Sequence, residues 1–593
     1  MKRKIYFYMT LVVIGVLLPA CSPSQAQINQ LSTKIAGEIY SSLTPNATIT
    51  PNKTPIPSVP ETPLEIFPVD SIMGLTEGTD GYPWWNDSVF YEIFVRSFYD
   101  SDGDGIGDLN GIIQKLDYLN DGDPDTNSDL GITGIWLMPI FPSPSYHGYD
   151  VTDYYDINPE YGTMDDFKTL LDEAHARGIR VIIDLVINHT SNQHPWFTQA
   201  ADPSSPYHDW YIWSDTNPGY TGSWGQQVWF PSYRQYYYST FTAGMPDLNY
   251  NNPEVTSQME DVVQYWLEDV GVDGFRMDAA KHLIEEGTVQ ANSPSTHIWW
   301  KEFRPFYKQV NPEALVVGEV WDDTSITAAY LQGDELDLSF EFWLASTVIR
   351  VVNSGNSETI ENQMEISYSQ IPNMQYATFL TNHDQDRVMD QLSNDESKMK
   401  VASALLLTSP GVPFIYYGEE IGMQGNQIHE RIRRPMQWTG DAAFGGFTTG
   451  SPWQALGEGW MLTNVADEMP ESDSIWSSYR DLIKIRNQHA ALRVGDLTIL
   501  TSTNDAIVSF LRVSNDEAVL VIVNLSDLPV DEVWLAKSES SLPEGVYQLV
   551  PILGSGYFNS LEVTGNGRLF HLIDTPQIAP HGVYILQLQA DIP

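Results

Sequence analysis

The segment RVIIDLVINH, residues 180–189, is the clearest indication of the fold of this chain. It is an apolar run of strand length that carries Asp184 and ends in Asn188 and His189. The segment GVDGFRMDA, residues 271–279, has the same plan, with Arg276 and Asp278 toward its end. Short apolar runs that alternate with longer helical patterns indicate repeated βα units around a parallel sheet.

Six further apolar runs of the same kind occur elsewhere in the chain. Helical patterns such as 167–177 and 257–270 lie between the runs. Eight strands of this type predict an α/β fold, a (β/α)₈ TIM barrel, whose chemistry gathers at the carboxyl ends of the strands. The candidate strands are 88–98, 131–140, 180–189, 271–279, 314–321, 336–343, 375–384 and 412–419.

Two further domains accompany the barrel. Residues 189–249, dense in Trp, Tyr, Pro and Asp, are too long for a simple loop, so we expect a small inserted domain after the third strand. Beyond a helical pattern at 474–487, only strand patterns follow, which predicts a C-terminal antiparallel β-sandwich over 493–593. The barrel then comprises residues 71–188 and 250–492. The C-terminal strand patterns lie at 506–513, 517–524, 532–535, 546–553, 568–573 and 582–588.

The N-terminus indicates export. Residues 1–20 join three basic residues to an apolar run, as in a signal peptide. Cys21, the single cysteine, follows Leu-Pro-Ala and resembles the bacterial lipobox, whose cysteine carries a lipid. Residues 21–70, rich in Ser, Thr, Pro and Asn, read as a flexible tether. We expect a cell-surface lipoprotein tethered only by this anchor; an ordinary secreted protein with an incidental cysteine is the alternative.

Composition limits the partners. The chain has 593 residues, 42% of them hydrophobic, enough to bury a large core. Its formal net charge of −48 would repel a phosphate backbone but leaves a neutral sugar polymer unaffected. Nucleic-acid binding is therefore not expected, and no oligomer is predicted.

Acidic residues stand at the ends of several predicted strands, namely Asp184, Asp278, Glu319 and Asp384. Any one of them could be a helix cap or an ion-pair partner. Their joint placement on the carboxyl face favours glycoside hydrolysis, which needs two carboxyl groups, ~5 Å apart when configuration is retained.

Seven blocks, in order, make the chain similar to the α-amylase family of glycoside hydrolases from about residue 84 to the C-terminus. The blocks are GIWLMP (134–139), DLVINH (184–189), MPDLN (245–249), GFRMD (274–278), GEVW (318–321), FLTNHD (379–384) and GVPFIYYG (411–418).

The resemblance implies roles for these residues. Asp278 attacks to form a covalent intermediate, Glu319 acts as acid and then base, and Asp384 binds sugar hydroxyls and steadies the distorted ring. Arg276, two residues before Asp278 and so on the same strand face, can hold the nucleophile ionised. Further residues implied to contact substrate are His147, Tyr149, Asp184, His189, Arg276, Lys281, His282, His383 and Arg387.

The loop DSDGDGIGD, residues 100–108, has oxygen-bearing side chains at every second position, with glycines that let the chain curl. Such oxygen ligands suit Ca²⁺, and Mg²⁺ is the alternative ion. By resemblance, the ligands of this structural ion are Asp100, Asp102, Asp104, the carbonyl of Ile106, and Asp108. A second calcium site of many α-amylases would use Asn188 and the carbonyl of His282.

Local departures narrow the choice within the family. The sequence Ala-Ala-Lys-His at 279–282 resembles endo-acting α-amylases, and MPDLN at 245–249 resembles an intermediate group between oligo-1,6-glucosidases and neopullulanases. We therefore expect a retaining endo-hydrolase of α-1,4-glucosidic bonds in starch, glycogen and maltooligosaccharides. An α-glucosidase, or a neopullulanase-like or transglycosylating enzyme, remains the alternative, because the motifs do not fix which acceptor resolves the intermediate.

Overall fold

The computed structural model describes residues 78–573 and 577–590. The predicted signal peptide, lipidated Cys21 and tether lie outside the described residues and stay predictions. Among the helices that are described, none is both long enough and apolar enough to cross a membrane.

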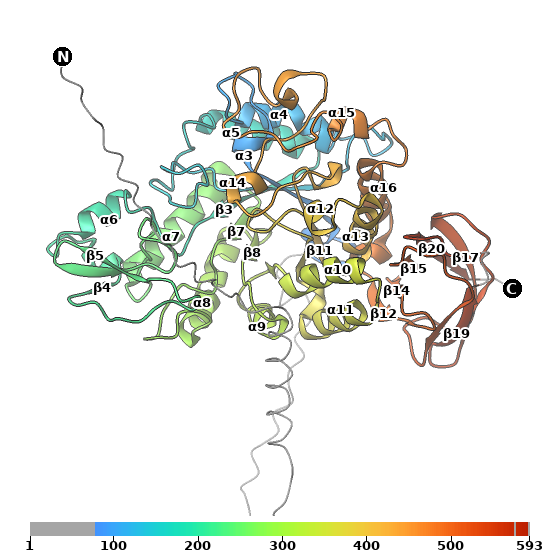
Figure 1. Ribbon diagram of the computed structural model, residues 1–593. Helices are drawn as coiled ribbons and strands as arrows, with labels where there is room; N and C mark the ends of the chain where they lie inside the picture. Colours follow the sequence, from blue (N-terminus) through green and yellow to red (C-terminus); the bar gives the residue numbers. More distant parts are fainter. Residues whose placement is uncertain (1–77, 574–576, 591–593) are drawn as a thin grey trace, which may run out of the picture. The chain divides into compact units, whose positions relative to one another are not determined.

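Eight parallel strands form the barrel. Their hydrogen-bonded order is β10-β11-β1-β2-β3-β7-β8-β9, and a parallel bridge between Phe340 and Ala377 joins the two ends of that order. Strands β3, β7 and β8 are neighbours near its centre (Figure 1). The predicted TIM barrel is confirmed, with strands shorter than expected: β1 Phe90–Ile93, β2 Gly134–Leu137, β3 Arg180–Leu185, β7 Gly274–Met277, β8 Leu315–Gly318, β9 Leu338–Ser339, β10 Ala377–Thr378 and β11 Val412–Tyr416.

The barrel interior is apolar at the bottom and charged at the top. Phe90 and Phe414, on paired strands, stack with ring centroids 4.5 Å apart. Gly134 is required beside them, because a Cβ there would lie 2.5 Å from the Phe90 ring. Since side chains alternate along a strand, the inward position two residues after Phe90 is Glu92, and two after Ile182 is Asp184. The same alternation brings the polar strand ends together inside the barrel.

Helices connect the strands. The expected helix at 167–177 corresponds to α5, which begins three residues earlier and ends one residue sooner, and whose N-terminus carries a reciprocal cap between Thr163 and Asp166. The pattern at 257–270 is split into α7 and the π-helical turn η4 (Tyr265–Val270), which ends at Gly271 with φ of 94°. The longer helices are α4 Leu109–Leu119, α5 Met164–Ala176, α7 Pro253–Gln264, α8 Pro294–Val310, α10 Phe342–Ser354, α11 Glu358–Gln370, α13 Glu396–Thr408 and α16 Ile475–Gln488.

An inserted segment leaves the barrel after β3 and returns before α7. It contains α6 (Pro195–Ala200) and a three-stranded antiparallel sheet of order β4-β6-β5. The strands are β4 Trp213–Ser214, β5 Trp229–Ser232 and β6 Gln235–Tyr238. An antiparallel bridge between His189 and Asp247 ties the start of the segment to its end, so both lie at the carboxyl end of β3.

The C-terminal region is an antiparallel sheet domain, which confirms the antiparallel arrangement expected for the predicted β-sandwich; nine strands, rather than the six predicted, form one hydrogen-bonded order. In β15, Leu520 and Ile522 belong to the sheet's own core, whereas the alternate Val519 and Val521 join the core of the barrel. This two-sided burial explains the continuous apolar run of β15. The strands are β12 Asp496–Ile499, β13 Thr501–Ser502, β14 Ile507–Val513, β15 Ala518–Asn524, β16 Val533–Lys537, β17 Gly545–Leu553, β18 Leu561–Thr564, β19 Arg568–Ile573 and β20 Val583–Ala590; the sequence reading missed β12, β13 and β18.

Candidate active site

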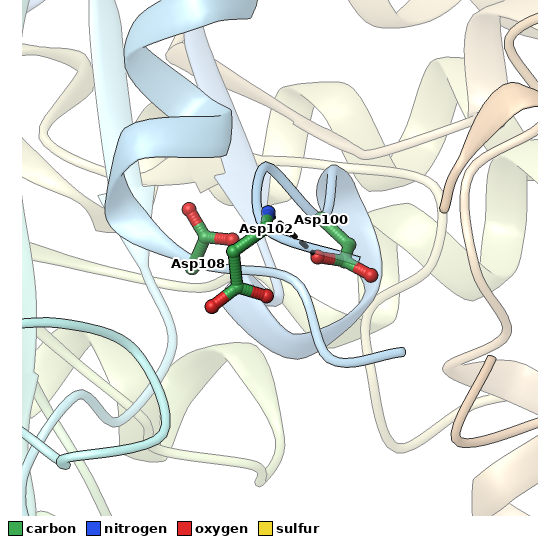
Figure 2. A group of neighbouring side chains, drawn as sticks. All are labelled: Asp100, Asp102 and Asp108. Atoms are coloured by element: carbon green, nitrogen blue, oxygen red, sulfur yellow. Dashed lines mark hydrogen bonds between the residues drawn. The ribbon is translucent and has the colours of Figure 1, made fainter. Parts of the chain in front are cut away.

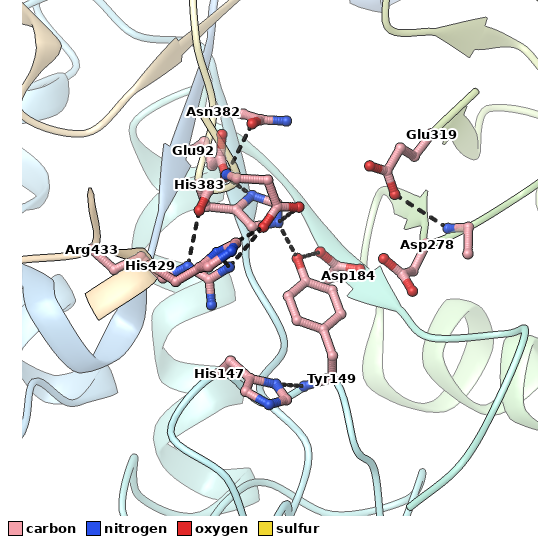
Figure 3. Close-up of polar contacts among 12 residues, drawn as sticks. Glu92, His147, Tyr149, Asp184, Asp278, Glu319, Asn382, His383, His429 and Arg433 are labelled. Atoms are coloured by element: carbon pink, nitrogen blue, oxygen red, sulfur yellow. Dashed lines mark hydrogen bonds and ion pairs between the residues drawn. The ribbon is translucent and has the colours of Figure 1, made fainter. Parts of the chain in front are cut away.

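One buried guanidinium gathers three carboxyl groups at the top of the barrel. Arg276, on β7, donates from Nη1 to both oxygens of Asp184 at 3.0 Å and to Oδ1 of Asp278 at 2.8 Å. Its Nη2 lies 2.7 Å from Oε2 of Glu319. Asp184 lies on β3, Asp278 follows β7 and Glu319 follows β8, so three adjacent parallel strands supply the cluster. Because both nitrogens belong to one guanidinium, Asp278 and Glu319 must lie close together, as Figure 3 shows.

The turn after β7 reinforces this pairing. Ala279 has φ of 51°, a left-handed conformation that is uncommon for a residue other than glycine. Its amide then donates to Oε2 of Glu319 at 3.3 Å. The residue next to Asp278 thus also orients Glu319.

A second group of charges surrounds His383. Its Nδ1 lies 2.5 Å from Oε1 of Glu92, and its Nε2 lies 3.3 Å from Oδ2 of Asp384. The hydroxyl of Tyr149 donates to Asp184 at 3.0 Å and lies 2.7 Å from Nε2 of His383. Arg433 donates from Nη2 to Oδ1 of Asp384 at 2.8 Å. In Figure 3, Tyr149 and Asp184 lie between this group and the pair Asp278–Glu319.

The first cluster is tuned toward protonation. Burial raises the pKa of Asp278 and of Glu319, and the charge of Arg276 opposes both shifts. The negative charges of Asp278 and Asp384 raise the pKa of Glu319 further. Burial also raises the pKa of Asp184 to about 7, against the charge of Arg276. A proton is therefore readily held among these carboxyl groups near neutral pH.

The second group is tuned toward charge. Burial acts to lower the pKa of His383, but Asp384 and Glu92 outweigh it and raise that pKa to about 9. Burial acts to raise the pKa of Asp384. The charge and hydrogen bond of His383, the hydrogen bond of His429 and the charge of Arg433 outweigh burial and hold that pKa well below its usual range. His383 is thus a cation between two carboxylates, and its Nε2–H donates to the Tyr149 oxygen.

Two more predicted histidines are neutral. His147 accepts the amide of Tyr149 at Nδ1 (3.1 Å), and burial lowers its pKa to about 4. The Nε2 of His189 lies 3.1 Å from the carbonyl oxygen of Tyr149, so that nitrogen carries the proton; burial lowers the pKa of His189 as well. Both histidines position Tyr149, whose ring stacks on His383 with centroids 5.5 Å apart.

A pocket of about 630 Å³ opens at this cluster. Lys281 reaches across it, with Nζ donating to the carbonyl of Trp321 at 2.5 Å and to Asp322 at 3.2 Å. His282 is held by a contact of 2.8 Å between its Nδ1 and the carbonyl of Gln290. The lining residues are Trp224, Phe241, Ala279, Lys281, His282, Glu319, Trp321, Asp384 and His429.

Of the predicted substrate-contacting residues, Lys281 and His282 line this pocket. The others belong to the two charged groups or contact Tyr149, except Arg387, which joins neither the pocket nor these groups. It is buried, with Nη1 donating to the carbonyl of Tyr417 (2.7 Å) and Nε to that of Ile432 (2.8 Å). Its guanidinium lies 4.4 Å from the ring centre of Tyr416. Arg387 is the residue directly before the short helix α12 (Val388–Gln391), and its hydrogen bonds go to backbone carbonyls outside the pocket lining. Arg433 is the arginine that contacts Asp384 instead.

Sequence reasoning missed Arg433, His429 and Glu92. Glu92 could have been found, because it lies two residues after the inward-facing Phe90 on β1. Arg433 and His429 lie beyond β11, outside the seven blocks, and no spacing in the sequence relates them to Asp384.

The predicted metal loop brings three of its acids together. Asp100, Asp102 and Asp108 each offer a carboxylate oxygen, all within 4.8 Å of one another (Figure 2). Because Ca²⁺–oxygen bonds are ~2.4 Å long, one ion could touch all three, so these residues fit the metal. Asp104 is not part of this trio; its Oδ1 accepts the amide of Ile106 at 2.8 Å.

The second predicted calcium site would lie where the inserted segment rejoins the barrel. Asn188 donates from Nδ2 to Oδ2 of Asp247 at 3.2 Å. Its Oδ1 is buried and has no hydrogen-bond partner among the described residues, and the same holds for Oε1 of Glu285. A donor oxygen suited to a cation is therefore present at the predicted position.

Comparisons with known proteins agree with this geometry. The model of the α-amylase catalytic domain matches residues 92–495. The chain is 41% identical to "Alpha-amylase 3" of Dictyoglomus thermophilum over 75% of this chain and 86% of that protein. It is 35% identical to "Trehalose synthase/amylase TreS" of Mycolicibacterium smegmatis, over 86% of this chain and 93% of the relative. Among solved structures, an α-amylase from H. orenii matches with a TM-score of 0.74 and 42% identity, covering 85% of this chain and 99% of that one. The chain therefore belongs to the α-amylase family of glycoside hydrolases.

Proposed function

We propose that the protein is a retaining endo-hydrolase of α-1,4-glucosidic bonds in starch, glycogen and maltooligosaccharides. One observation carries the proposal: Asp278 and Glu319 both bind the guanidinium of Arg276, at 2.8 and 2.7 Å, on neighbouring strands that open on one pocket. Two carboxyl groups that share one guanidinium are held near each other, which favours the short separation of a retaining mechanism over the wider one of an inverting mechanism.

In the first step, Asp278 attacks the anomeric carbon while the bond to the glycosidic oxygen breaks. Glu319 gives its proton to that oxygen, and a glycosyl ester on Asp278 results. The hydrogen bond from Arg276 keeps Asp278 oriented and favours its charged form. Burial and the nearby carboxylates favour the protonated form of Glu319, which is the form the acid needs.

In the second step, Glu319 removes a proton from water, and the water oxygen displaces Asp278 from the anomeric carbon. The sugar is meanwhile held by the second group of charges. Asp384 accepts hydrogen bonds from sugar hydroxyls, and its ion pairs with His383 and Arg433 keep it charged. Tyr149 links this group to the first one, because its hydroxyl contacts both Asp184 and His383.

Lys281 and His282 support the endo-acting assignment, since both line the pocket beside Glu319. A second candidate function is sugar transfer, in which a sugar hydroxyl replaces water in the second step. The similarity to a relative named trehalose synthase/amylase favours this candidate, because that name joins both activities in one protein.

The test is a product time course on soluble starch, pullulan and maltose, with Asp278→Asn as the control. Rapid loss of iodine staining with mixed maltooligosaccharides, absent in the variant, is expected. Trehalose formed from maltose without net hydrolysis would establish the transferase instead, and glucose released mainly from maltose would establish an α-glucosidase.

Two further assignments belong to this proposal. Asp100, Asp102 and Asp108 would hold a structural Ca²⁺, remote from proton transfer, which would tie the loop to the start of α4. The export signal and Cys21 would place the enzyme outside the cytoplasm. There it would have access to polymeric glucans, which cannot cross a membrane.

A further inference from the structure

Trp224 is an exposed aromatic residue on the wall of the active-site pocket. Its side chain is 61% exposed, although it belongs to the inserted segment, where Trp210 and Trp229 are buried. It lines the same pocket as Glu319 and Trp321. A large apolar ring left in water at the mouth of a pocket has a face available for a ligand.

The loop around Trp224 holds the ring in a fixed place. A bridge between Thr221 and Gln227 closes the loop, and the amide of Gly222 donates to the carbonyl of Gln226 at 2.8 Å. The Gln226 side chain accepts the amide of Trp224 (3.0 Å) and donates to the carbonyl of Thr240 (3.0 Å). A Cβ at position 222 would lie 2.1 Å from the end of the Gln226 side chain and would push that side chain away from Trp224.

The ring also packs on the rings of the active site. Its centroid lies 5.9 Å from that of Phe241 and 5.8 Å from that of His282. Phe241 in turn lies 5.3 Å from His189. Trp224 is therefore attached to the Lys281–His282 side of the pocket.

That side is where the leaving group must lie. Glu319 protonates the oxygen that joins the cleaved sugar to the leaving group, so the wall beyond Glu319 faces the departing chain. His282, Lys281 and Trp321 are on that wall. His383 lies on the other side of Tyr149 and Asp184 from Glu319 (Figure 3).

We propose that Trp224 is a stacking platform for a glucose unit of the leaving group, and that it sets the enzyme's preference for α-glucans with a long leaving group. The inference rests on the proposed function. The chemistry is that of a pyranose face, whose C–H groups pack on an indole while its hydroxyls stay in water. The ligand is neutral, which suits a chain of net charge −48.

The experiment compares two substrates that offer the same maltotriosyl unit for transfer to Asp278. In 4-nitrophenyl α-maltotrioside the leaving group is a single aryl ring, whereas in maltohexaose it is a further maltotriose. Trp224→Ala should lower kcat/KM on maltohexaose about tenfold, the loss expected for one well-packed aromatic contact, and change it less than about twofold on the aryl substrate. Trp224→Phe should restore most of the loss. Trp534→Ala, which removes a tryptophan 36% exposed on β16, is the matched control and should leave both values unchanged.

An equal loss on both substrates would show that Trp224 only supports the fold of the pocket, and no loss on either would show that it binds nothing; both overturn the proposal. The assay measures the rate at which the substrate is cleaved, and this rate is the same quantity whether water or a sugar hydroxyl then accepts the glycosyl group. The wild-type ratio of hydrolysis to transfer therefore tests the proposed function separately from the effect of Trp224.

Discussion

Two groups of carboxylates in this protein differ in the counter-charges that the chain itself supplies. In the active site, Arg276 binds three of them and His383 lies between two more. In the loop 100–108, Asp100, Asp102 and Asp108 converge within 4.8 Å, and no cationic side chain of the described residues pairs with them. The active site therefore carries its own counter-charges and can keep one carboxyl group protonated beside an ionised one. The loop has no such counter-charge from the described part of the chain, and we propose that a cation from solution supplies it.

The largest effect should come from removing the acid of the active site. Glu319→Gln keeps the shape of the side chain but has no proton to give, so kcat should fall by about 10²–10⁴-fold or more. The measurement is release of reducing ends from maltohexaose, with circular dichroism and oligosaccharide binding as controls for folding. Unchanged hydrolysis by the variant would refute the assignment of Glu319.

Removing the counter-charge should damage stability as well as activity. Arg276→Met leaves three buried carboxyl groups without their cation, which should cost about 3–5 kcal/mol in the free energy of unfolding. The loss should shrink as pH falls, because protonation removes the unpaired charges. Urea denaturation at several pH values measures this. Arg180→Met, which removes a half-exposed partner of Asp273, is the control and should cost about 0–1 kcal/mol. An equal loss of unfolding free energy in Arg276→Met and Arg180→Met would show that Arg276 is no more important as a counter-charge than a half-exposed arginine.

The second cation of the active site should give a pH-dependent effect. The pKa of His383 is about 9 in the folded protein, above its ordinary value of 6.5, so the stability it adds is fully present below pH 6.5 and is lost as pH rises through 9. The difference in unfolding free energy between wild type and His383→Asn should fall by about 3 kcal/mol over that range. A difference that does not vary with pH would show that His383 is neutral in the folded state.

The smallest effect concerns the loop that lacks counter-charges. A chelator should lower the melting temperature of the wild type, corresponding to a loss of about 2–3 kcal/mol at a free calcium concentration near 100 times Kd. Asp102→Ala should melt at the lower temperature with or without chelator, while its activity at moderate temperature stays near that of the wild type. An unresponsive wild type would refute the metal loop, and a fully responsive Asp102→Ala would move the ion to another site.

The sequence predicted the barrel well because its signal is local. Each strand shows an apolar run that ends in a polar residue, and parallel strands must present those ends on one face. The apolar runs in the sequence are longer than the strands in the structure, so the predicted strands ended too late. Residues 138–140, for example, continue an apolar pattern but lie beyond β2, because burial between loops and helices also favours apolar side chains.

The sequence by itself determined the order of the strands, the positions of Asp184, Asp278, Glu319 and Asp384 at their ends, and the acidic loop after β1. Alternation along a strand and the residues of each block carry that information. Alternation also shows that Glu92 faces inward, but which distant residues contact one another in the site follows only from the tertiary structure. Arg433 reaches Asp384 from 49 positions away, Glu92 reaches His383 from 291, and Arg387 turns away although it lies three residues after Asp384. Closure of the barrel fixes such contacts, and no local pattern encodes where a closed sheet brings its first and last strands together.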